Sequence, residues 1–412
     1  MFKKLVALLT IFLIYVSSAL HALAVEISAP SGILIDFNTG QILYQKNAYQ
    51  KMYPASTTKI LTAIIAIERG NLNDIVTVPK EASPIDGSKI YLTPGEQLTL
   101  EQLLYAIMLE SANDAAVSIA VHIGGSVENF AKLMNQKAKE LGAKNSNFVN
   151  PNGLPNPNHY TTAYDLSQIA RYAMQNPKFR EIVSTVHYTI PPTNKFDKPR
   201  ELYNSNRLIK ATSYHYEGAD GIKTGYTVVA KETLVASATR NGHRLITVVM
   251  GAEGRNIWTD TITLLNYGFN NFTYKKLSTK NEVIKELPIG KGTIHLATDR
   301  DAYYTVKKED ENRIEKNIVL NKNIKKPIKS GEVLGFVEYK LNGNTIEKVK
   351  LISLESVDIF GNIKSGKSSN PFDKYLKWSI ILFSPFIGLY AVRFIIKKRR
   401  KNSYLFQKKK GW

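Results

Sequence analysis

The sequence predicts an α+β first domain and a small all-β second domain, and three observations support this. Strand-length apolar runs lie near both ends of residues 25–274, and segments with helical periodicity lie between them. From about Lys275 the helical periodicity gives way to short runs separated by charged turns. Strands from both ends of one segment, with helices between them, indicate a single antiparallel sheet flanked by helices.

The N-terminus indicates the compartment. "MFKK" precedes the apolar run "LVALLTIFLIYVSSAL", and "ALA" (Ala22–Ala24) provides small residues at a cleavage site. We expect a secretory signal peptide over residues 1–24; an uncleaved anchor is the alternative. The chain has no cysteine, which excludes disulfides, thiolate metal sites and cysteine nucleophiles.

The first domain, residues 25–274, begins with a predicted hairpin. Its sequence "GILIDFNTGQILYQKN" places two short apolar runs around Asn38-Thr39-Gly40. Apolar residues at three- and four-residue spacing then predict helices in four stretches: residues 60–70, 99–125, 126–143 and 161–175. In the last stretch Thr162 and Asp165 resemble a capping box, with Asp in place of the usual Glu or Gln.

Strands are predicted again from Gly218 to Ala252, where Asn241-Gly242 between apolar runs favours a hairpin turn. "IWTDTITLLNYGF" then predicts a helix that closes the domain. Residues 275–362 form the β-rich domain, which contains no residue pattern typical of catalysis. Residues 363–377 are a polar linker.

The C-terminus predicts a membrane anchor. Residues 378–396, "WSIILFSPFIGLYAVRFII", are long enough to span a bilayer as a helix, and "KKRRK" follows directly. The positive-inside tendency leaves residues 397–412 as a basic cytoplasmic tail and the two domains on the outer side. Pro385 and Arg393 weaken the span, so an anchoring helix in the membrane plane stays open.

The net charge of +20 fits this topology. Nine Lys and Arg residues and no acid lie from Arg393 to the end, and Lys3 and Lys4 belong to the signal peptide, which leaves +9 for the exported part. Such a charge suits anionic envelope polymers or a lipid surface. An exported chain with no nucleic-acid-binding motif is not expected to bind nucleic acid.

"YPASTTKILTA" places Ser56 and Lys59 three positions apart at a predicted helix start. In one interpretation Ser56 is the N-cap and Lys59 is solvated. In the other, both side chains share one helix face, so that the amine reaches the hydroxyl and the helix N-terminus favours developing negative charge. Ser56 is the one serine in the chain that is followed by a lysine three residues later.

Two further tripeptides bear on this choice. Ser111-Ala112-Asn113 lies at a helix boundary, and Lys223-Thr224-Gly225 lies on a late strand. Each is weak alone, and a second Ser-x-Asn occurs at residues 368–370. The set Ser-x-x-Lys, Ser-x-Asn and Lys-Thr-Gly in this order is typical of class A β-lactamases and penicillin-binding proteins.

With these residues, the chain resembles the D-alanyl-D-alanine carboxypeptidase family of low-molecular-weight penicillin-binding proteins. "PASTTKILTA", "LLYAIMLESANDAA", "NPNGLP", "HYTTAYDLSQIA" and "GADGIKTGYT" carry the resemblance, which extends over nearly the whole chain. It implies a periplasmic enzyme on the plasma membrane that trims peptidoglycan stem peptides and is inhibited covalently by β-lactams. The tail departs from the family because it is more span-like than the common in-plane anchor.

The resemblance implies a role for each residue of the set. Ser56 is the nucleophile, and Lys59 accepts its proton if burial and the nearby charge of Lys223 keep the amine neutral. Ser111 relays a proton to the leaving amine, and Asn113 positions Lys59 and the substrate amide.

The remaining roles concern binding. Lys223 and Thr224 hold the terminal carboxylate, and Gly225 lets the strand backbone approach the substrate. The backbone N–H groups of Ser56 and Tyr226 form the oxyanion hole. No metal or cofactor is required.

Three further residues are open to alternative interpretations. Arg255 is an additional carboxylate ligand or a solvated loop arginine. His159 is a structural hydrogen-bonding residue rather than a triad base, since the lysine serves as base. Asp220 shapes the start of the strand rather than acting in catalysis.

Four other functions remain open. A β-lactamase shares the motifs but gains nothing from the second domain and the anchor. A DD-endopeptidase uses the same site, although its relatives usually lack the β-domain, and a cross-linking transpeptidase is normally larger with an N-terminal anchor. A non-catalytic wall-binding module would not require Ser56 or Lys59.

Overall fold

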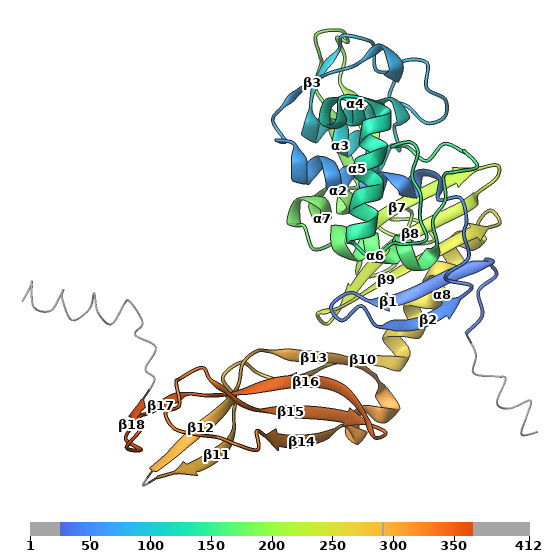
Figure 1. Cartoon of the computed structure of the whole chain (residues 1–412). Helices are drawn as coiled ribbons and strands as arrows, with labels where there is room; N and C mark the ends of the chain where they lie inside the picture. The colour runs from blue at the N-terminus through green and yellow to red at the C-terminus, as the bar shows by residue number, and fades with distance from the viewer. Residues whose placement is uncertain (1–24, 291, 366–412) are drawn as a thin grey trace, which may run out of the picture. The chain divides into compact units, whose positions relative to one another are not determined.

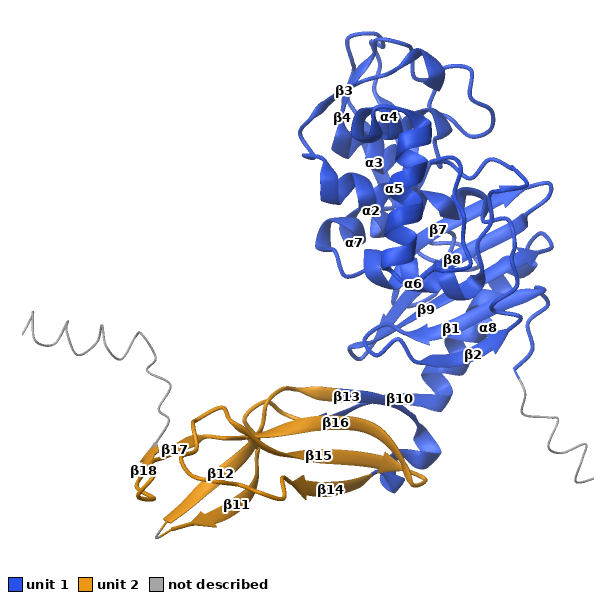
Figure 2. Cartoon of the chain, in the orientation of Figure 1, with its two compact units in different colours: residues 1–277, 303–314 blue, residues 278–302, 315–412 orange. Residues whose placement is uncertain are grey.

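The computed structural model describes residues 25–290 and 292–365. These form two compact units: residues 25–277 with 303–314, and residues 278–302 with 315–365 (Figure 2). The predicted signal peptide, the anchor over residues 378–396 and the basic tail lie outside the described residues. Within the described ranges no helix is long and apolar enough to span a bilayer.

The first unit contains an antiparallel five-stranded sheet in the order β2-β1-β9-β8-β7 (Figure 1). Its strands are β1 (Ser31–Asp36), β2 (Ile42–Lys46), β7 (Ala219–Thr227), β8 (Lys231–Arg240) and β9 (His243–Ala252). β1 pairs with β9 over its whole length, from Ser31 opposite Met250 to Asp36 opposite Leu245. The predicted sheet, built from strands at both ends of the domain, is therefore confirmed.

The helices are inserted between β2 and β7, and one more follows β9 (Figure 1). They are α2 (Lys59–Arg69), α3 (Leu100–Leu109), α4 (Asn113–Gly124), α5 (Val127–Glu140), α6 (Ala163–Ala173), α7 (Pro177–Ser184) and α8 (Asn256–Asn271). The stretch predicted over residues 99–125 is two helices that are interrupted at Ser111, which has a φ of 62°. α7 was not predicted.

The core lies on both faces of the sheet. On β1, Ile33 and Ile35 pack with the inserted helices, whereas Leu34 packs on the other face with residues of α8 such as Leu264. This alternation follows from the two-residue period of a strand. Both faces are buried, so the sheet forms the middle layer between α8 and the inserted helices.

Short elements connect these layers. The turn η1 (Ala55–Thr58) precedes α2, and the turn η2 (Lys80–Ala82) lies in the segment before α3. Two small ladders pair β3 (Ile75–Thr77) with β4 (Gln97–Thr99) and β5 (His187–Ile190) with β6 (Arg200–Tyr203).

The second unit is built on a five-stranded antiparallel sheet in the order β11-β12-β16-β15-β14. Its strands are β11 (Val283–Ile289), β12 (Gly292–Thr298), β14 (Glu315–Leu320), β15 (Val333–Leu341) and β16 (Asn344–Ser353). The hairpin of β17 (Glu355–Val357) and β18 (Ile363–Ser365) follows. β18 thus occupies the first three residues assigned to the linker from sequence.

β10 (Phe272–Ser278) pairs with β13 (Ala302–Lys307), and the turn η3 (Lys308–Arg313) follows β13. The chain therefore leaves the first unit after Leu277, returns to it at Tyr303 and leaves it again after Ile314.

Candidate active site

Ser56 lies in the turn η1, not at the cap of a helix. Pro54 is the N-cap of η1 and Thr58 is the N-cap of α2, and neither side chain makes a capping bond. The expectation that Ser56 caps the helix is therefore wrong, because an extra turn of 3-10 helix separates it from the first residue of α2. Thr57, not Ser56, bonds back to the chain, through its hydroxyl to the carbonyl of Pro54 at 2.6 Å.

Lys59, the first residue of α2, is completely buried beside Ser56. Its Nζ donates to Ser56 Oγ at 3.1 Å, to Asn113 Oδ1 at 2.7 Å and to the carbonyl of Asn152 at 2.7 Å. Burial holds the pKa of Lys59 well below its usual value, and the positive charge of Lys223 adds to the effect. In its neutral form the amine keeps two N–H donors for Asn113 and Asn152 and presents its lone pair to Ser56, so it can accept the proton of the serine hydroxyl.

Asn113, the first residue of α4, links Lys59 to the loop that contains residues 86–88. Its Nδ2 donates to the carbonyl of Asp86 at 2.6 Å, and its backbone N–H donates to the carbonyl of Ser88 at 2.7 Å. The Ser-x-Asn and Ser-x-x-Lys motifs therefore meet through side-chain contact.

Ser111 lies at the break between α3 and α4 in a left-handed backbone conformation. Its Oγ is buried and has no hydrogen-bond partner among the described residues. A buried hydroxyl is normally bonded, so this one is available for a substrate or a water molecule.

Lys223 is buried in the middle of β7, with 1% of its surface exposed. Its Nζ donates to the carbonyl of Thr224 at 3.1 Å, and burial lowers its pKa to about 7. The hydroxyl of Thr224 is 2.7 Å from Ser205 Oγ.

Two glycines allow the backbone around Ser56 to pack closely. A Cβ added at Gly225 would lie 2.8 Å from the backbone nitrogen of Ser56, and one added at Gly153 would lie 1.8 Å from the carbonyl oxygen of Ala55. Gly225 therefore lets β7 approach η1, in addition to the substrate approach expected from sequence. Tyr226 follows Gly225 on β7 with an exposed side chain.

Asn152 was missed by sequence reasoning, because it contributes a carbonyl and no side-chain chemistry. "NPNGLP" was noted only as a family signature. Its neighbourhood is held by the buried His159, whose Nδ1 accepts from the N–H of Val149 at 3.1 Å. Its Nε2 then carries the proton and donates to Thr58 Oγ1 at 2.9 Å. Burial lowers the pKa of His159 to about 4, which favours a neutral structural residue.

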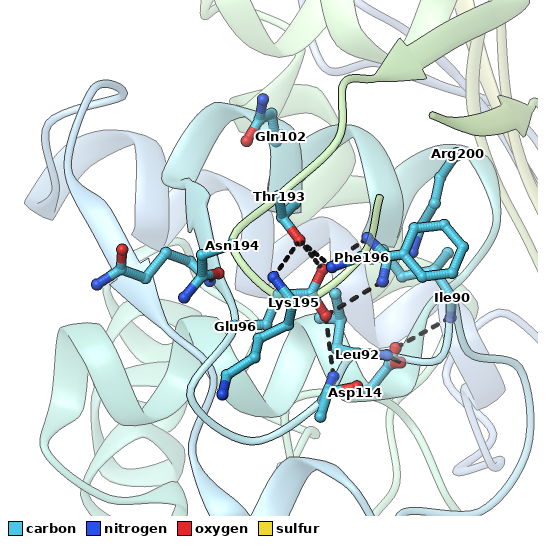
Figure 3. A network of polar contacts seen from close by, with 12 residues as sticks. Ile90, Leu92, Glu96, Gln102, Asp114, Thr193, Asn194, Lys195, Phe196 and Arg200 are labelled. Atoms are coloured by element: carbon cyan, nitrogen blue, oxygen red, sulfur yellow. Dashed lines mark hydrogen bonds and ion pairs between the residues drawn. The ribbon is translucent and has the colours of Figure 1, made fainter. Parts of the chain in front are cut away.

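A polar network fixes the loop that contacts Asn113 (Figure 3). Asp114 accepts from the backbone N–H groups of Ile90 and Leu92 at 3.3 and 2.9 Å. The buried Glu96 forms a bidentate pair with Arg200 at 2.7 and 3.1 Å. Burial raises the pKa of Glu96, but the hydrogen bonds and charge of Arg200, together with hydrogen bonds from Thr93 and Thr193, outweigh it and leave the pKa lowered.

A groove of about 540 Å³ opens beside Glu110, the residue before Ser111. Its other lining residues are Lys89, Ile90, Tyr91, Phe196, Arg200, Glu201 and Leu202.

Arg255 and Asp220 lie apart from these contacts. Arg255 is exposed at the start of α8, three residues after the end of β9, and no side-chain bond is found for it among the described residues. Asp220 pairs with Arg244 at 2.5 Å, in agreement with a structural role. Within the described part of the chain no three His, Asp or Glu side chains cluster as metal ligands.

Comparison with protein families identifies the first unit. The family model described as D-alanyl-D-alanine carboxypeptidase matches residues 17–254. The chain belongs to the D-alanyl-D-alanine carboxypeptidase family. A second family model, described as penicillin-binding protein 5, C-terminal domain, matches residues 272–358.

Relatives of this carboxypeptidase cover most of its length. D-alanyl-D-alanine carboxypeptidase DacF of Bacillus subtilis is 36% identical over 345 residues, which are 81% of this chain and 87% of the relative. The structure of penicillin-binding protein 5 from Haemophilus influenzae is similar with a TM-score of 0.68 and 31% identity, over 82% of this chain and 98% of that one. A mutant of a Streptomyces DD-transpeptidase matches 60% of this chain and 99% of its own, with a TM-score of 0.56 and 34% identity.

Proposed function

We propose that the chain is a serine-type D-Ala-D-Ala carboxypeptidase that removes the terminal D-alanine from peptidoglycan stem peptides through an acyl-enzyme on Ser56. The observation that supports this most directly is the buried Lys59, whose Nζ is 3.1 Å from Ser56 Oγ and whose pKa is lowered. A serine hydroxyl needs a base of this kind to attack a peptide carbonyl.

The acylation step follows from this pair. Ser56 Oγ attacks the carbonyl carbon of the penultimate D-alanine while its proton moves to Lys59. The backbone N–H groups of Ser56 and Tyr226 stabilise the oxyanion; loss of one such donor costs about 10²–10³ in rate. Ser111 passes a proton to the leaving amine, free D-alanine departs, and water then hydrolyses the ester.

Substrate binding depends on charge and close approach. Protonated Lys223, with the hydroxyl of Thr224, holds the terminal carboxylate and so selects a C-terminal residue. Asn113 orients the substrate amide through its side-chain amide group. Arg255 supplies a second positive charge for the carboxylate. A β-lactam occupies the same positions and acylates Ser56.

The exported part consists of the signal-processed residues 25–274 and 275–362, which lie on the outer side of the plasma membrane. Residues 378–396 anchor it to the bilayer, and residues 397–412 remain cytoplasmic.

The decisive experiment measures free D-alanine released from a peptide ending in D-Ala-D-Ala. The chain from residue 25 onward, in detergent micelles, is compared with its Ser56→Ala variant. We expect release by the first and a loss of at least about 10⁴-fold in the second, with penicillin labelling lost as well. Labelling that survives in Ser56→Ala would contradict the assignment of the nucleophile.

Two other outcomes point to other functions. A folded, penicillin-labelled chain that releases no D-alanine would favour cleavage of cross-links, for which the groove beside Glu110 offers room for a second stem peptide. Rapid hydrolysis of the penicilloyl ester would favour a β-lactamase.

A further inference from the structure

The tip of the β17–β18 hairpin exposes two large apolar side chains side by side. Ile359 is 66% exposed and Phe360 is 83% exposed. Single exposed apolar residues are common, but an adjacent pair at a turn that ends a domain is a candidate contact surface. The turn is fixed, because Asp358 Oδ1 accepts from the backbone N–H groups of Phe360 and Asn362 at 2.9 and 2.8 Å.

Lysines surround this tip. Ile328 forms a two-way backbone bridge with Val357, each bond 2.8 Å long, so the chain around Ile328 runs beside β17. This part of the chain and β18 contribute four exposed lysines: Lys325, Lys326, Lys329 and Lys364. A Cβ added at Gly361 would lie 2.6 Å from Lys326 Nζ, so this ammonium group lies against the turn itself.

Three carboxylates also lie at this end, and Glu355 pairs with His295. Asp358 bonds to its own turn as described, and Glu332 Oε2 accepts from the N–H of Lys329 at 2.9 Å. The four lysines outnumber these carboxylates, so the surface is apolar at its centre and carries an excess of positive charge around it. Peripheral membrane surfaces that bind anionic lipids have this composition.

The position of the hairpin in the chain favours a lipid bilayer as the partner of this surface. Only residues 366–377 separate β18 from the anchor proposed above, on which this inference rests. A segment of that length reaches at most about 45 Å when fully extended. The tip is thus tethered near a bilayer.

We propose that Ile359 and Phe360 insert into the interfacial region of an anionic bilayer while the surrounding lysines contact lipid phosphates. The anchor then holds the chain at the membrane, and the hairpin tip provides a second contact from the β-rich unit.

The absence of cysteine allows a direct test with the full chain in vesicles. An environment-sensitive fluorophore is attached to Ile359→Cys, and as a matched control to Asn344→Cys, an exposed position at the start of β16. Vesicles contain phosphatidylglycerol and a quencher attached to the lipid acyl chains. We expect quenching at 359 to exceed that at 344 by at least about threefold.

Three conditions define the contact. Phe360→Ser should reduce quenching at 359 to the control level, and so should Lys→Gln changes at 325, 326 and 329 together. Replacing phosphatidylglycerol by phosphatidylcholine should also reduce quenching at 359, since it removes the negative surface potential of the vesicle.

The outcomes separate this inference from the proposals it rests on. A chain that sediments with vesicles but shows equal, weak quenching at 359 and 344 overturns the membrane contact and leaves the anchor intact. A chain that stays in the supernatant overturns the anchor and the inference with it. A shifted emission at 359 without acyl-chain quenching assigns the tip to contact with protein and also overturns it. D-alanine release from a soluble peptide reports on the enzyme separately.

Discussion

At the residue scale, the site contains two buried amines, and burial explains why the pKa of each is lowered. Lys59 and Lys223 are each almost completely buried, and neither forms an ion pair within the described residues. Keeping an amine out of water disfavours its charged form. The same burial that suits Lys59 to the proposed role of base reduces the stability of the fold, as is common at functional sites.

Lys223→Met should therefore stabilise the chain while abolishing carboxylate binding. The pKa of Lys223 is lowered to about 7 in the fold, from the 10.5 that is ordinary for a lysine. Between these two pKa values the unfolded chain binds more protons at Lys223 than the folded chain does. The free energy of unfolding of the native chain therefore increases as the pH rises from about 7 to about 10. The stability gain of the variant should be largest below pH 7 and decline towards pH 10, by at most about 5 kcal/mol. Urea unfolding at several pH values measures it.

A matched control is Lys89→Met, a partly exposed lysine in the groove beside the site. It should change stability little and show no trend across this pH range. A Lys223→Met variant whose stability difference is constant with pH would contradict a lowered pKa in the fold.

Ser111→Ala should lower activity without lowering stability. The hydroxyl of Ser111 is buried without a hydrogen-bond partner, so its removal breaks no bond in the free enzyme. If it relays the proton to the leaving amine, kcat should fall by about 10²–10⁴-fold. Thermal unfolding and D-alanine release, measured on the same preparation, check both parts. A large fall in Tm would show that Ser111 has a structural partner instead.

The sequence predicted which side chains meet more reliably than how the backbone supports them. Spacing within the three motifs, together with the family resemblance, was sufficient to group Ser56, Lys59 and Asn113. The carbonyl of Asn152 could not be predicted, because every residue has one and only the fold determines its direction. The cap assigned to Ser56 was wrong, since a Ser before an apolar run does not reveal an intervening 3-10 turn.

At the scale of elements, the loop of residues 86–96, which contacts Asn113, is held at two points. Asp114, next to Asn113, binds its backbone, and the Glu96–Arg200 pair ties its end to β6 (Figure 3). The segment from Asp86 to Ser88, whose carbonyls bind Asn113, lies just before the first of these attachments. The position of Asn113 therefore depends on contacts outside the three motifs.

Arg200→Met should destabilise the chain by about 3–5 kcal/mol, because it leaves the buried carboxylate of Glu96 without its charged partner. Loosening of the loop should also slow acylation by penicillin. Chemical denaturation and the rate of penicillin labelling provide the two measurements.

The double variant Glu96→Gln/Arg200→Met is the control. Removing both charges should recover much of the lost stability, as expected for residues that interact directly. Additive losses in the double variant would show that the two side chains do not form a coupled pair.

Periodicity predicted the long elements and missed the short ones. α2 ends at Arg69 before Gly70, and the Asn241-Gly242 turn has two positive φ values, as the sequence indicated. The ladders β3–β4 and β5–β6 escaped prediction because strands of three or four residues are too short to show an alternating pattern. α7 begins with proline after the N-cap Asn176, a start signal present in the sequence but not used.

At the scale of the whole molecule, the first unit is discontinuous in sequence. After residues 278–302, which belong to the second unit, the chain returns and contributes β13 to the first unit. The buried Asp36 at the end of β1 accepts from Thr305 Oγ1 of β13 at 2.7 Å and is 2.9 Å from His243 Nε2. Burial raises the pKa of Asp36, but these bonds and those from Thr39 outweigh it and leave the pKa lowered. A cut at residue 274, suggested by the sequence, would remove Thr305 from this cluster.

Thr305→Val should consequently weaken the first unit although it lies beyond the sequence-based domain boundary. The change keeps the shape of the side chain and removes a hydrogen bond to a charged group, which costs about 1.5–3 kcal/mol. Thr293→Val, at an exposed position on β12, is the matched control and should be nearly neutral. Equal effects of the two changes in denaturant unfolding would contradict the role of Thr305.

The pairing of β1 with β9 imposes an order on folding in the export proposed above. If the chain crosses the membrane N-terminus first, β1 is outside long before Met250, its partner opposite Ser31, has been translocated. A hairpin of β1 and β2 alone is only marginally stable. Until β9 is available, β1 therefore has one unpaired edge, and both of its faces lack their packing partners. The inserted helices make local contacts and can form in the meantime. In the proposed export, assembly of Ser56 with β7 is therefore a late event, and activity should appear only after most of the chain has been translocated.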